Sequence, residues 1–563
     1  MKKYLFLLLF FSVLKTLQAQ DHGSAVAPLI TQYQADEVML NRKYPLKRAD
    51  EYFLRMGRFY QDWLVKLTSL KFNQLTVNER VDYILLKRNI NSSLRGINLA
   101  HADFKANRFS IPFAGTIVDF EQKRRIGKQQ DGRLISEAFE KLKNGIKVSI
   151  KAIDNLSPPQ ANWARQTVDQ YQTVFAEAYK FYDGYDPEFT KATKNIYLEV
   201  NAALKDYADE LSKMAKLSMS KDDGSGIIGN PIGKTAFLNL LKEEMIAYAP
   251  EEIEKIAMRE FAWCDAEMLK ASAEMGFGKN WKKALEKVKS DYPDLGKQPE
   301  LVYALANEAI SFVEREQLII IPELAKEGWR MRMLSAEEQQ YAPFFLGGES
   351  VLIAYPTSGM DEDAKLMTLK GNNRHFSRAV VFHELIPGHN LQYFMQNRYK
   401  TYRKGFGTPF WTEGWSLYWE MLLWDKGFAK TPEDKIGMLF WRMHRCARII
   451  FSMNYHLGKW TPKQCIDFLV DRVGFERANA EAEVRRSFTG GYGPLYQIGY
   501  MLGGLEFRAL HRELVGSGKM SNFKFHDRIL KENNMPVEMV RAILTNERLP
   551  ENFNTKWRFA GNL

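Results

Sequence analysis

Cysteine is scarce in this sequence: only Cys264, Cys446 and Cys465 occur in 563 residues. Three scattered thiols are too few for a disulfide framework in a chain of this length, so its stability must come from a packed core. No CxxC pair is present, which argues against a structural zinc site built from cysteines. The length is compatible with two lobes or with one large helical body.

Long apolar runs are also missing after the first twenty residues. No stretch of about 18 apolar residues occurs there, so we expect no integral membrane segment. Residues 1–20 combine a charged start at Lys2 and Lys3, an apolar run over 4–14, and the small residue Ala19 before polar positions. This layout is typical of a secretory signal peptide. No cysteine lies near the expected cleavage point, which argues against a lipid anchor there, and we expect an exported protein, periplasmic or secreted.

The sequence also lacks a segment in which charges of one sign are concentrated. The formal net charge is +11. Removing the three lysines of the signal peptide lowers it to about +8, spread over the whole chain. Short basic clusters such as 123–125 lack the interleaved aromatic residues and the density of a nucleic-acid surface. We therefore expect no nucleic-acid partner.

Apolar residues at helical spacing dominate what remains. Between about residues 25 and 219 they recur every three or four positions, which predicts a series of amphipathic helices. Thr76 stands three residues before Glu79, the spacing of a capping box at a helix start. Glycine, proline and aspartate gather within 221–234, which indicates a loop. We place a boundary there, between an N-terminal helical region, 21–233, and a C-terminal region, 234–563.

One segment breaks the helical rhythm. Residues 350–355 read Ser, Val, Leu, Ile, Ala, Tyr between two glycines and a proline, which is typical of a short strand. A turn of buried helix is equally compatible with this pattern. The sequence as a whole predicts a mainly α-helical fold with a small sheet.

The segment from His383 to His389 reads His, Glu, Leu, Ile, Pro, Gly, His. A catalytic zinc takes about three protein ligands and keeps one position for water, and imidazole suits it. His383 and His389 are therefore candidate ligands, and Glu384 is placed to take a proton from the water. In a straight helix their six-residue spacing means about 9 Å of rise and roughly 120° of divergence. Pro387 and Gly388 resolve this, because proline breaks helical bonding and glycine permits a kink or bulge that returns His389 to the metal.

A third ligand is required, and Glu413 is the best candidate. It begins the run Glu, Gly, Trp, Ser, Leu, Tyr, Trp, Glu at 413–420, among apolar and aromatic residues. A carboxylate in such surroundings is costly to bury unless it is paired or bound to a metal. Glu420, two helical turns later on a similar face, is the alternative, either as the ligand or as a partner of one.

With these two motifs the chain resembles the bacterial domain-of-unknown-function family 885, regarded as zinc metallopeptidases with HExxPGH followed by EGWxLYxE. Both patterns are present, at 383–389 and 413–420, and the resemblance runs through most of the chain after residue 20. It implies a zinc site held by His383, His389 and Glu413, with Glu384 as general base. It does not identify the substrates.

The resemblance extends to a later segment. An arginine-rich stretch with Arg445 and Arg448 leads to His456, ahead of Trp460. By this resemblance His456 is expected to stabilise the oxyanion that forms on the attacked carbonyl. A satisfied structural histidine is an equally open interpretation.

Two tyrosines and an arginine complete the expected site. Tyr496 matches a family tyrosine and is expected to donate a hydrogen bond to the transition state, while Tyr492 competes for that role or contacts substrate. A buried core tyrosine is equally compatible with either position. Arg508 is expected to hold a substrate carboxylate, and an ordinary surface arginine is the alternative. The run at 490–499 departs from the family pattern, in which a proline and a glutamine come shortly before Tyr, Lys, Ile, Gly.

Taken together, these features predict a zinc-dependent hydrolase that cleaves peptide bonds through a metal-activated water. We expect a large helical body resembling zinc peptidases, with the strand near 351–355 beside the metal helix, where it would pair with an extended peptide substrate. Two alternatives share the pattern: a zinc hydrolase acting on a non-peptide amide or ester, and a non-catalytic helical binding protein. Glu384 argues against the second, because a binding module needs no general base.

Overall fold

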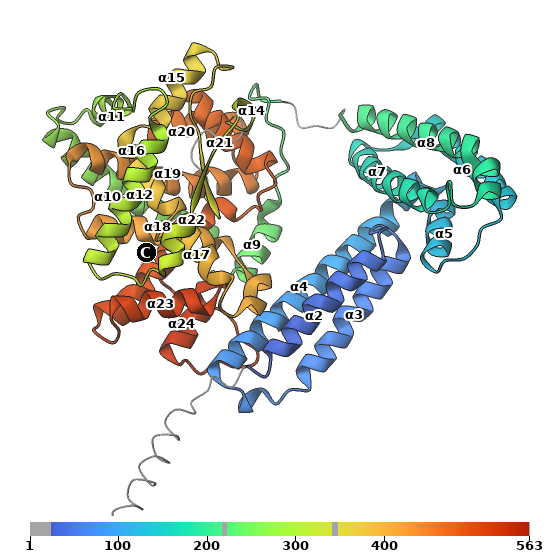
Figure 1. The fold of residues 1–563 in the computed structure, drawn as a ribbon, viewed down its shortest axis with the longest axis horizontal. Helices are drawn as coiled ribbons and strands as arrows, with labels where there is room; N and C mark the ends of the chain where they lie inside the picture. The colour runs from blue at the N-terminus through green and yellow to red at the C-terminus, as the bar shows by residue number, and fades with distance from the viewer. Residues whose placement is uncertain (1–23, 217–221, 340–346, 562–563) are drawn as a thin grey trace, which may run out of the picture.

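The computed structural model describes residues 24–216, 222–339 and 347–561. Within these ranges the chain is mainly helical, with a single two-stranded sheet, which confirms the predicted fold class. The expected signal peptide, 1–20, lies outside the described residues. Figure 1 shows a large body, formed by residues after 222, and two smaller groups of helices that precede it in the chain.

The first group is a bundle of three long helices: α2 (Ala27–Lys43), α3 (Asp50–Thr68) and α4 (Val77–Asn107), blue in Figure 1. α4 begins at the predicted capping box. Thr76 Oγ1 accepts a hydrogen bond from the Glu79 amide at 3.4 Å, and the Glu79 carboxylate accepts one from the Thr76 amide at 2.8 Å. Apolar residues of this bundle share one hydrophobic core with the large body, which joins the two by continuous packing.

The second group has a hydrophobic core of its own. It contains α5 (Ala114–Arg125), α6 (Gly132–Lys151), α7 (Pro158–Lys180) and α8 (Pro187–Lys216). α4 reaches both cores, because Ile90 belongs to the first and Phe104 to the second. The hydrophobic cores therefore part along α4, while a division between separate regions at residues 233 and 234 stays a prediction.

The large body contains the remaining helices and the sheet. Its α-helices are α9 (Gly233–Glu243), α10 (Pro250–Glu274), α11 (Trp281–Lys289), α12 (Gln298–Arg315), α13 (Glu323–Gly328), α14 (Ala336–Gln339), α15 (Glu362–Gly371), α16 (Arg374–Glu384), α17 (His389–Gln396), α18 (Pro409–Asp425), α19 (Pro432–His456), α20 (Pro462–Val473), α21 (Arg477–Thr489), α22 (Tyr496–His511), α23 (Asn522–Glu532) and α24 (Val537–Thr545). The loop predicted within 221–234 is present over 222–232, just before α9.

Two helices at the centre of the body, α18 and α22, approach each other through glycines. A Cβ added to Gly414 on α18 would lie 2.5 Å from the carbonyl carbon of Gly503, and one added to Gly503 on α22 would lie 2.9 Å from the Gly414 Cα. Side chains at either position would hold the helices apart. This contact brings Glu413 on α18 into reach of Tyr496 on α22.

The sheet consists of β1 (Arg330–Met333) and β2 (Ser350–Ile353), which run parallel with Arg330 opposite Ser350. The strand interpretation of this segment is confirmed, and the buried-helix alternative is wrong. The chain just before β2 contacts the helix that carries the second histidine, because Asn390 Nδ2 donates to the Gly348 carbonyl at 3.1 Å. The sheet therefore lies beside the candidate site.

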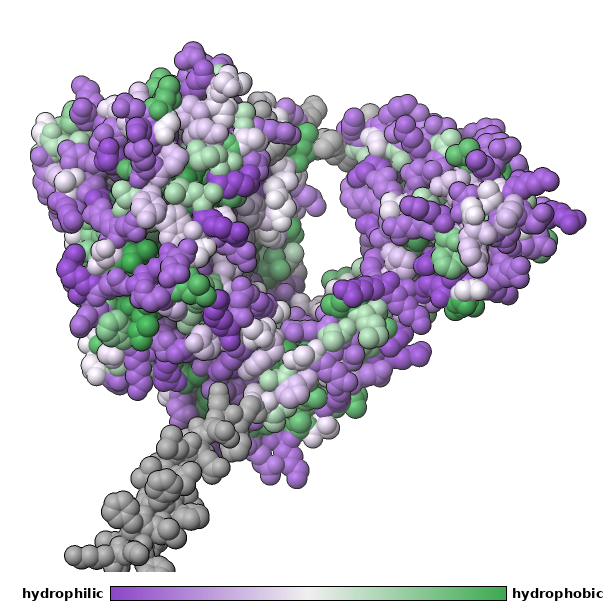
Figure 2. All heavy atoms as spheres, viewed as in Figure 1, coloured by the Kyte–Doolittle hydropathy of each residue, from purple (hydrophilic) through white to green (hydrophobic). Residues whose placement is uncertain are grey.

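The surface in view is mainly polar. Figure 2 shows hydrophilic residues over most of this face, with apolar residues in small separate patches. Among the described residues, no helix combines the length and the apolar character needed to cross a bilayer.

Candidate metal centre

A complete break between α16 and α17 brings the two motif histidines together. α16 ends at Glu384, α17 begins at His389, and the Ile386–Pro387 bond between them is cis. The Gly388 amide donates to the Phe382 carbonyl at 3.0 Å. A Cβ on Gly388 would lie 2.6 Å from that oxygen and would overlap the carbonyl of His383. The interruption predicted at this point is therefore a full change of helix and not a kink within one, and it sets the two imidazole rings 4.9 Å apart.

Glu413 lies opposite the outward nitrogens of both histidines. Its Oε2 is 3.1 Å from His389 Nε2 and 3.5 Å from His383 Nε2. Glu420 lies on the other side of the His383 ring, where its Oε1 is 2.7 Å from Nδ1. All four side chains are buried. The geometry therefore gives Glu413 the position expected of a ligand and Glu420 that of a carboxylate that orients one.

Glu384 completes the group. One ligand atom each from His383, Glu384 and His389 lies within 4.8 Å of the others, and Glu384 Oε2 is 3.9 Å from His389 Nε2. Burial raises the pKa of Glu384, against the opposing pull of the two histidines. We refer to His383, Glu384, His389 and Glu413 as the metal-site cluster.

The electrostatics of the metal-site cluster suit a cation between its members. Burial lowers the pKa of His383, but Glu413 and Glu420 outweigh it and raise this pKa to about 9. Burial likewise raises the pKa of Glu413, and the two histidines outweigh it and hold this pKa well below its usual range. The facing atoms thus favour a shared positive charge, which a divalent metal supplies when it replaces the proton.

The donor set fits zinc in particular. Two imidazole nitrogens and one carboxylate oxygen are typical of catalytic zinc sites, which leave a further position for water. Glu420 is placed to accept the Nδ1 proton of His383, which leaves Nε2, the nitrogen that faces Glu413, as the atom that would bind a metal in place of its proton. The residues present are therefore compatible with a zinc ion at this position.

Tyrosines line the cluster on the α22 side. The Tyr496 hydroxyl donates to Glu413 Oε1, and burial together with Glu413 raises the pKa of Tyr496 far above its usual value. The Tyr492 ring lies 4.4 Å from that of Tyr496. Tyr500, which we did not predict, is near-parallel to His383 with ring centroids 6.2 Å apart. Its position one helical turn after Tyr496 is the sequence signal that points to it.

Two predicted residues lie elsewhere. Arg445 on α19 lies beside the site, with its Nη2 3.4 Å from Glu420 Oε1. His456 comes 11 positions later on the same helix, or about 16 Å further along its axis. Its ring lies beside Phe488, at 5.9 Å, and burial lowers its pKa to about 4. Arg508 Nη2 pairs with Asp425 at 2.9 Å. In the part of the chain that the structure describes, neither side chain contacts the metal-site cluster.

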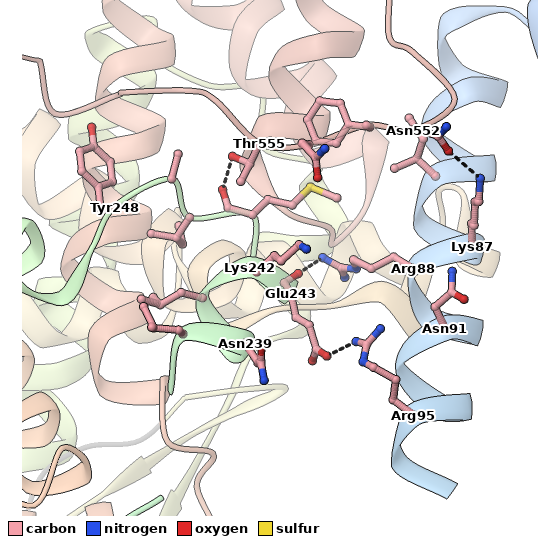
Figure 3. A pocket seen from close by; sticks show the side chains of 18 of the residues that line it. Lys87, Arg88, Asn91, Arg95, Asn239, Lys242, Glu243, Tyr248, Asn552 and Thr555 are labelled. Carbon is pink, nitrogen blue, oxygen red and sulfur yellow. Dashed lines mark hydrogen bonds and ion pairs between the residues drawn. The ribbon is translucent and has the colours of Figure 1, made fainter. Parts of the chain in front are cut away.

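A separate cavity of about 840 Å³ lies between α4, α9 and the segment that follows α24 (Figure 3). Arg88 donates to the Glu243 carbonyl there, and Arg95 pairs with the Glu243 carboxylate. None of the predicted site residues lines this cavity. Its ion pairs connect the N-terminal bundle to the body.

Comparisons with known proteins identify the family and the fold. The model of the family described as "Bacterial protein of unknown function (DUF885)" matches residues 42–544. A solved structure described as a putative lipoprotein of unknown function from Shewanella oneidensis is 17% identical, covers 93% of this chain and 100% of its own, and superposes with a TM-score of 0.66. A putative lipoprotein from Colwellia psychrerythraea is 19% identical, covers 83% and 76%, with a TM-score of 0.51. No curated protein matches the chain.

Proposed function

The chain belongs to the DUF885 family of bacterial proteins of unknown function, and we propose that it is a zinc-dependent hydrolase that cleaves peptide bonds. One observation carries the proposal. The outward nitrogens of His383 and His389 converge on Glu413 Oε2, with Glu384 at their side. A ligand triad with an adjacent carboxylate is the arrangement that metal-assisted hydrolysis requires.

Each member of the group has a separate task in the proposed reaction. His383, His389 and Glu413 would hold zinc, which when bound would polarise the scissile carbonyl and lower the pKa of the attacking water. Glu384 accepts a proton from that water and later returns it to the departing amine. Its pKa, raised by burial, suits a group that must both take and release a proton.

The surrounding carboxylate and tyrosine position the ligands. Glu420 keeps His383 in one tautomer, and Tyr496 holds Glu413 through its Oε1, which leaves Oε2 toward the histidines. These contacts make Tyr496 a positioning residue for Glu413. Because its ring is partly exposed beside the cluster, the same hydroxyl is also suitably located to approach a bound substrate.

The proposal includes export of the protein to the periplasm or the surroundings. The signal-peptide pattern at 1–20 supports it, as does the description of both similar structures as lipoproteins. Fractionating cells and sequencing the N-terminus of the recovered protein tests this. An unprocessed protein in the cytoplasmic fraction would contradict it.

The decisive experiment separates metal binding from the general base. We would measure bound metal by mass spectrometry, together with hydrolysis of a peptide library, for the wild type and for Glu384→Gln. We expect about one zinc per chain in both. The variant should retain less than about 1% of the activity, because general-base catalysis contributes about 10²–10⁴-fold.

Each outcome has a distinct meaning. A carefully prepared wild type without zinc would refute the metal site. Zinc binding with turnover of esters or non-peptide amides, but of no peptide, would identify the alternative hydrolase. Equal activity of the wild type and Glu384→Gln would refute the assignment of the base.

A further inference from the structure

Three buried arginines gather beside the metal-site cluster. Arg445 and Arg448 come from α19, and their guanidinium carbons lie 4.8 and 4.3 Å from the centre of the Tyr500 ring. Arg486 comes from α21, with its guanidinium carbon 5.1 Å from the Tyr492 ring. All three side chains are at most one-tenth exposed. Cations placed so deeply need anions nearby.

The carboxylates of this cluster do not match its cations in number. Arg445 Nη2 lies 3.4 Å from Glu420 Oε1, and Arg448 Nε donates to Glu483 Oε1 at 2.7 Å. Burial and the nearby Arg448 lower the pKa of His444 to about 3, so His444 is neutral at pH 7. Outside the metal-site cluster, these three arginines face only two carboxylates among the described residues, Glu420 and Glu483.

Arg486 is the arginine without a carboxylate of its own. Its Nε lies 3.9 Å from Glu483 Oε2, beyond hydrogen-bonding distance, while Glu483 bonds Arg448 directly. The Arg486 Nε is buried and has no hydrogen-bond partner among the described residues. Arg445 Nε and Arg448 Nη1 share this property, but both of those arginines bond a carboxylate through another nitrogen. Its Nη2 donates to the Tyr492 hydroxyl at 3.2 Å. A planar guanidinium with a spare donor is suited to a bidentate contact with a carboxylate.

The same arginine lies close to the proposed reaction centre. Arg486 contacts Tyr492, the Tyr492 ring lies 4.4 Å from Tyr496, and the Tyr496 hydroxyl bonds Glu413. Tyr492 and Tyr496 are both partly exposed, so solvent reaches these two tyrosines. A substrate group that enters beside Tyr492 would lie next to the Arg486 guanidinium, which Tyr492 contacts.

We propose that Arg486, together with the Tyr492 hydroxyl, binds a carboxylate of the substrate, which directs the enzyme to peptides that carry this group near the scissile bond. The inference rests on the proposed hydrolase function. It also replaces Arg508 in the role predicted from sequence, because Asp425 already neutralises Arg508. A peptide can present the carboxylate at its C-terminus, as for an exopeptidase, or on an acidic side chain.

A binding measurement tests this without turnover. In the zinc-loaded Glu384→Gln protein, calorimetry would compare Ala-Ala-Ala, its C-terminal amide, and Ala-Ala-Glu amide. We expect at least one carboxylate-bearing peptide to bind about 10- to 100-fold more tightly than the neutral amide, as hydrogen bonds to a charged group provide. Preference for the free terminus or for the glutamate identifies the source of the carboxylate. Equal affinity for all three peptides would overturn the proposal.

Substitutions then assign the preference to one residue. Arg486→Gln, added to Glu384→Gln, should abolish it, and Arg486→Lys should restore part of it, because lysine keeps the charge but not the planar fork. Arg472→Gln is the matched control, since Arg472 pairs with Asp265 at 2.7 Å on α10, and it should keep the full preference. Loss of the preference in Arg508→Gln instead of Arg486→Gln would overturn the assignment. Circular dichroism checks that each variant is folded. If Arg486→Gln does not fold, the preference is compared between Arg486→Lys and the unsubstituted Arg486 protein.

A turnover measurement separates this inference from the proposed function. With an otherwise wild-type enzyme, Arg486→Gln should raise KM for the preferred acidic peptide about 10- to 100-fold, so the ratio of kcat/KM for that peptide to kcat/KM for the neutral amide should fall by about the same factor. Absence of any hydrolysis by the wild type would refute the proposed function. The binding preference is tested separately, because calorimetry does not depend on turnover. A uniform loss of kcat on all peptides would show a merely structural role for Arg486.

Discussion

Replacing Gly388 by alanine tests whether the break between α16 and α17 creates the metal-site cluster. The added Cβ would lie 2.5 Å from the carbonyl carbon of His383 and 2.6 Å from the carbonyl oxygen of Phe382, whereas real Cβ contacts do not fall below 3.0 Å. Both neighbours are backbone atoms in the last turn of α16, so no side chain can swing away.

The shift needed to accommodate alanine is large on the scale of a metal site. The two stated contacts alone require the backbone to separate by about 0.5 Å, and the His383 carbonyl oxygen, which is closer still, requires a larger shift. Ligand constellations tolerate displacements of only about 0.5 Å. His383 and His389 lie on opposite sides of the gap, so the shift changes their separation directly. We expect Gly388→Ala to lose about 1–3 kcal/mol of stability through overpacking. Its peptide hydrolysis should fall about 100-fold, as displacements near 1 Å do.

The assay combines zinc titration against a chelating dye, denaturant unfolding and peptide turnover. Gly96→Ala is the matched control, because Gly96 lies within α4 and an added Cβ there would meet nothing within 4 Å. It should leave zinc affinity unchanged and gain roughly 0.5–1 kcal/mol from helix propensity. The reasoning would be refuted if Gly388→Ala bound zinc and hydrolysed peptides as well as the wild type and were as stable as Gly96→Ala.

Two further predictions follow from particular contacts. Glu413→Gln should abolish zinc retention. Glu420→Gln removes the carboxylate that contacts His383 Nδ1 and Arg445 but no proposed ligand, so it should weaken zinc affinity about 10- to 100-fold. Equal losses of zinc affinity in the two variants, measured by dye competition, would contradict their separate roles. Burial lowers the pKa of His526 to about 3, so the unfolded chain binds its proton more readily and stability is lost as the pH falls below about 6.5 toward 3. Between pH 7.5 and 5.5 the wild type should lose about 1.4 kcal/mol more unfolding free energy than His526→Gln. The same loss of unfolding free energy in both proteins, measured by denaturant unfolding at the two pH values, would contradict this.

Local patterns in the sequence predicted a helix start and the position of the break. The capping box of Thr76 and Glu79 forms between neighbouring residues, and Pro387 with Gly388 acts on the chain at its own position. The strand at 350–353 also depends on its pairing with 330–333, which is why the sequence left a turn of buried helix open there. The HExxPGH and EGWxLYxE patterns likewise named His383 and Glu413 before their geometry was known.

Only the tertiary structure decided which of several compatible residues meet. Glu413 and Glu420 lie on similar faces of α18, and their different places relative to His383 depend on how α16 crosses that helix. The sequence alone allowed Arg508 to bind a substrate carboxylate, but the packing of α18 against α22 pairs this arginine with Asp425. The direction of a side chain and the charge that neutralises it are set by contacts between helices far apart in the chain. Residue spacing within one helix does not contain that information.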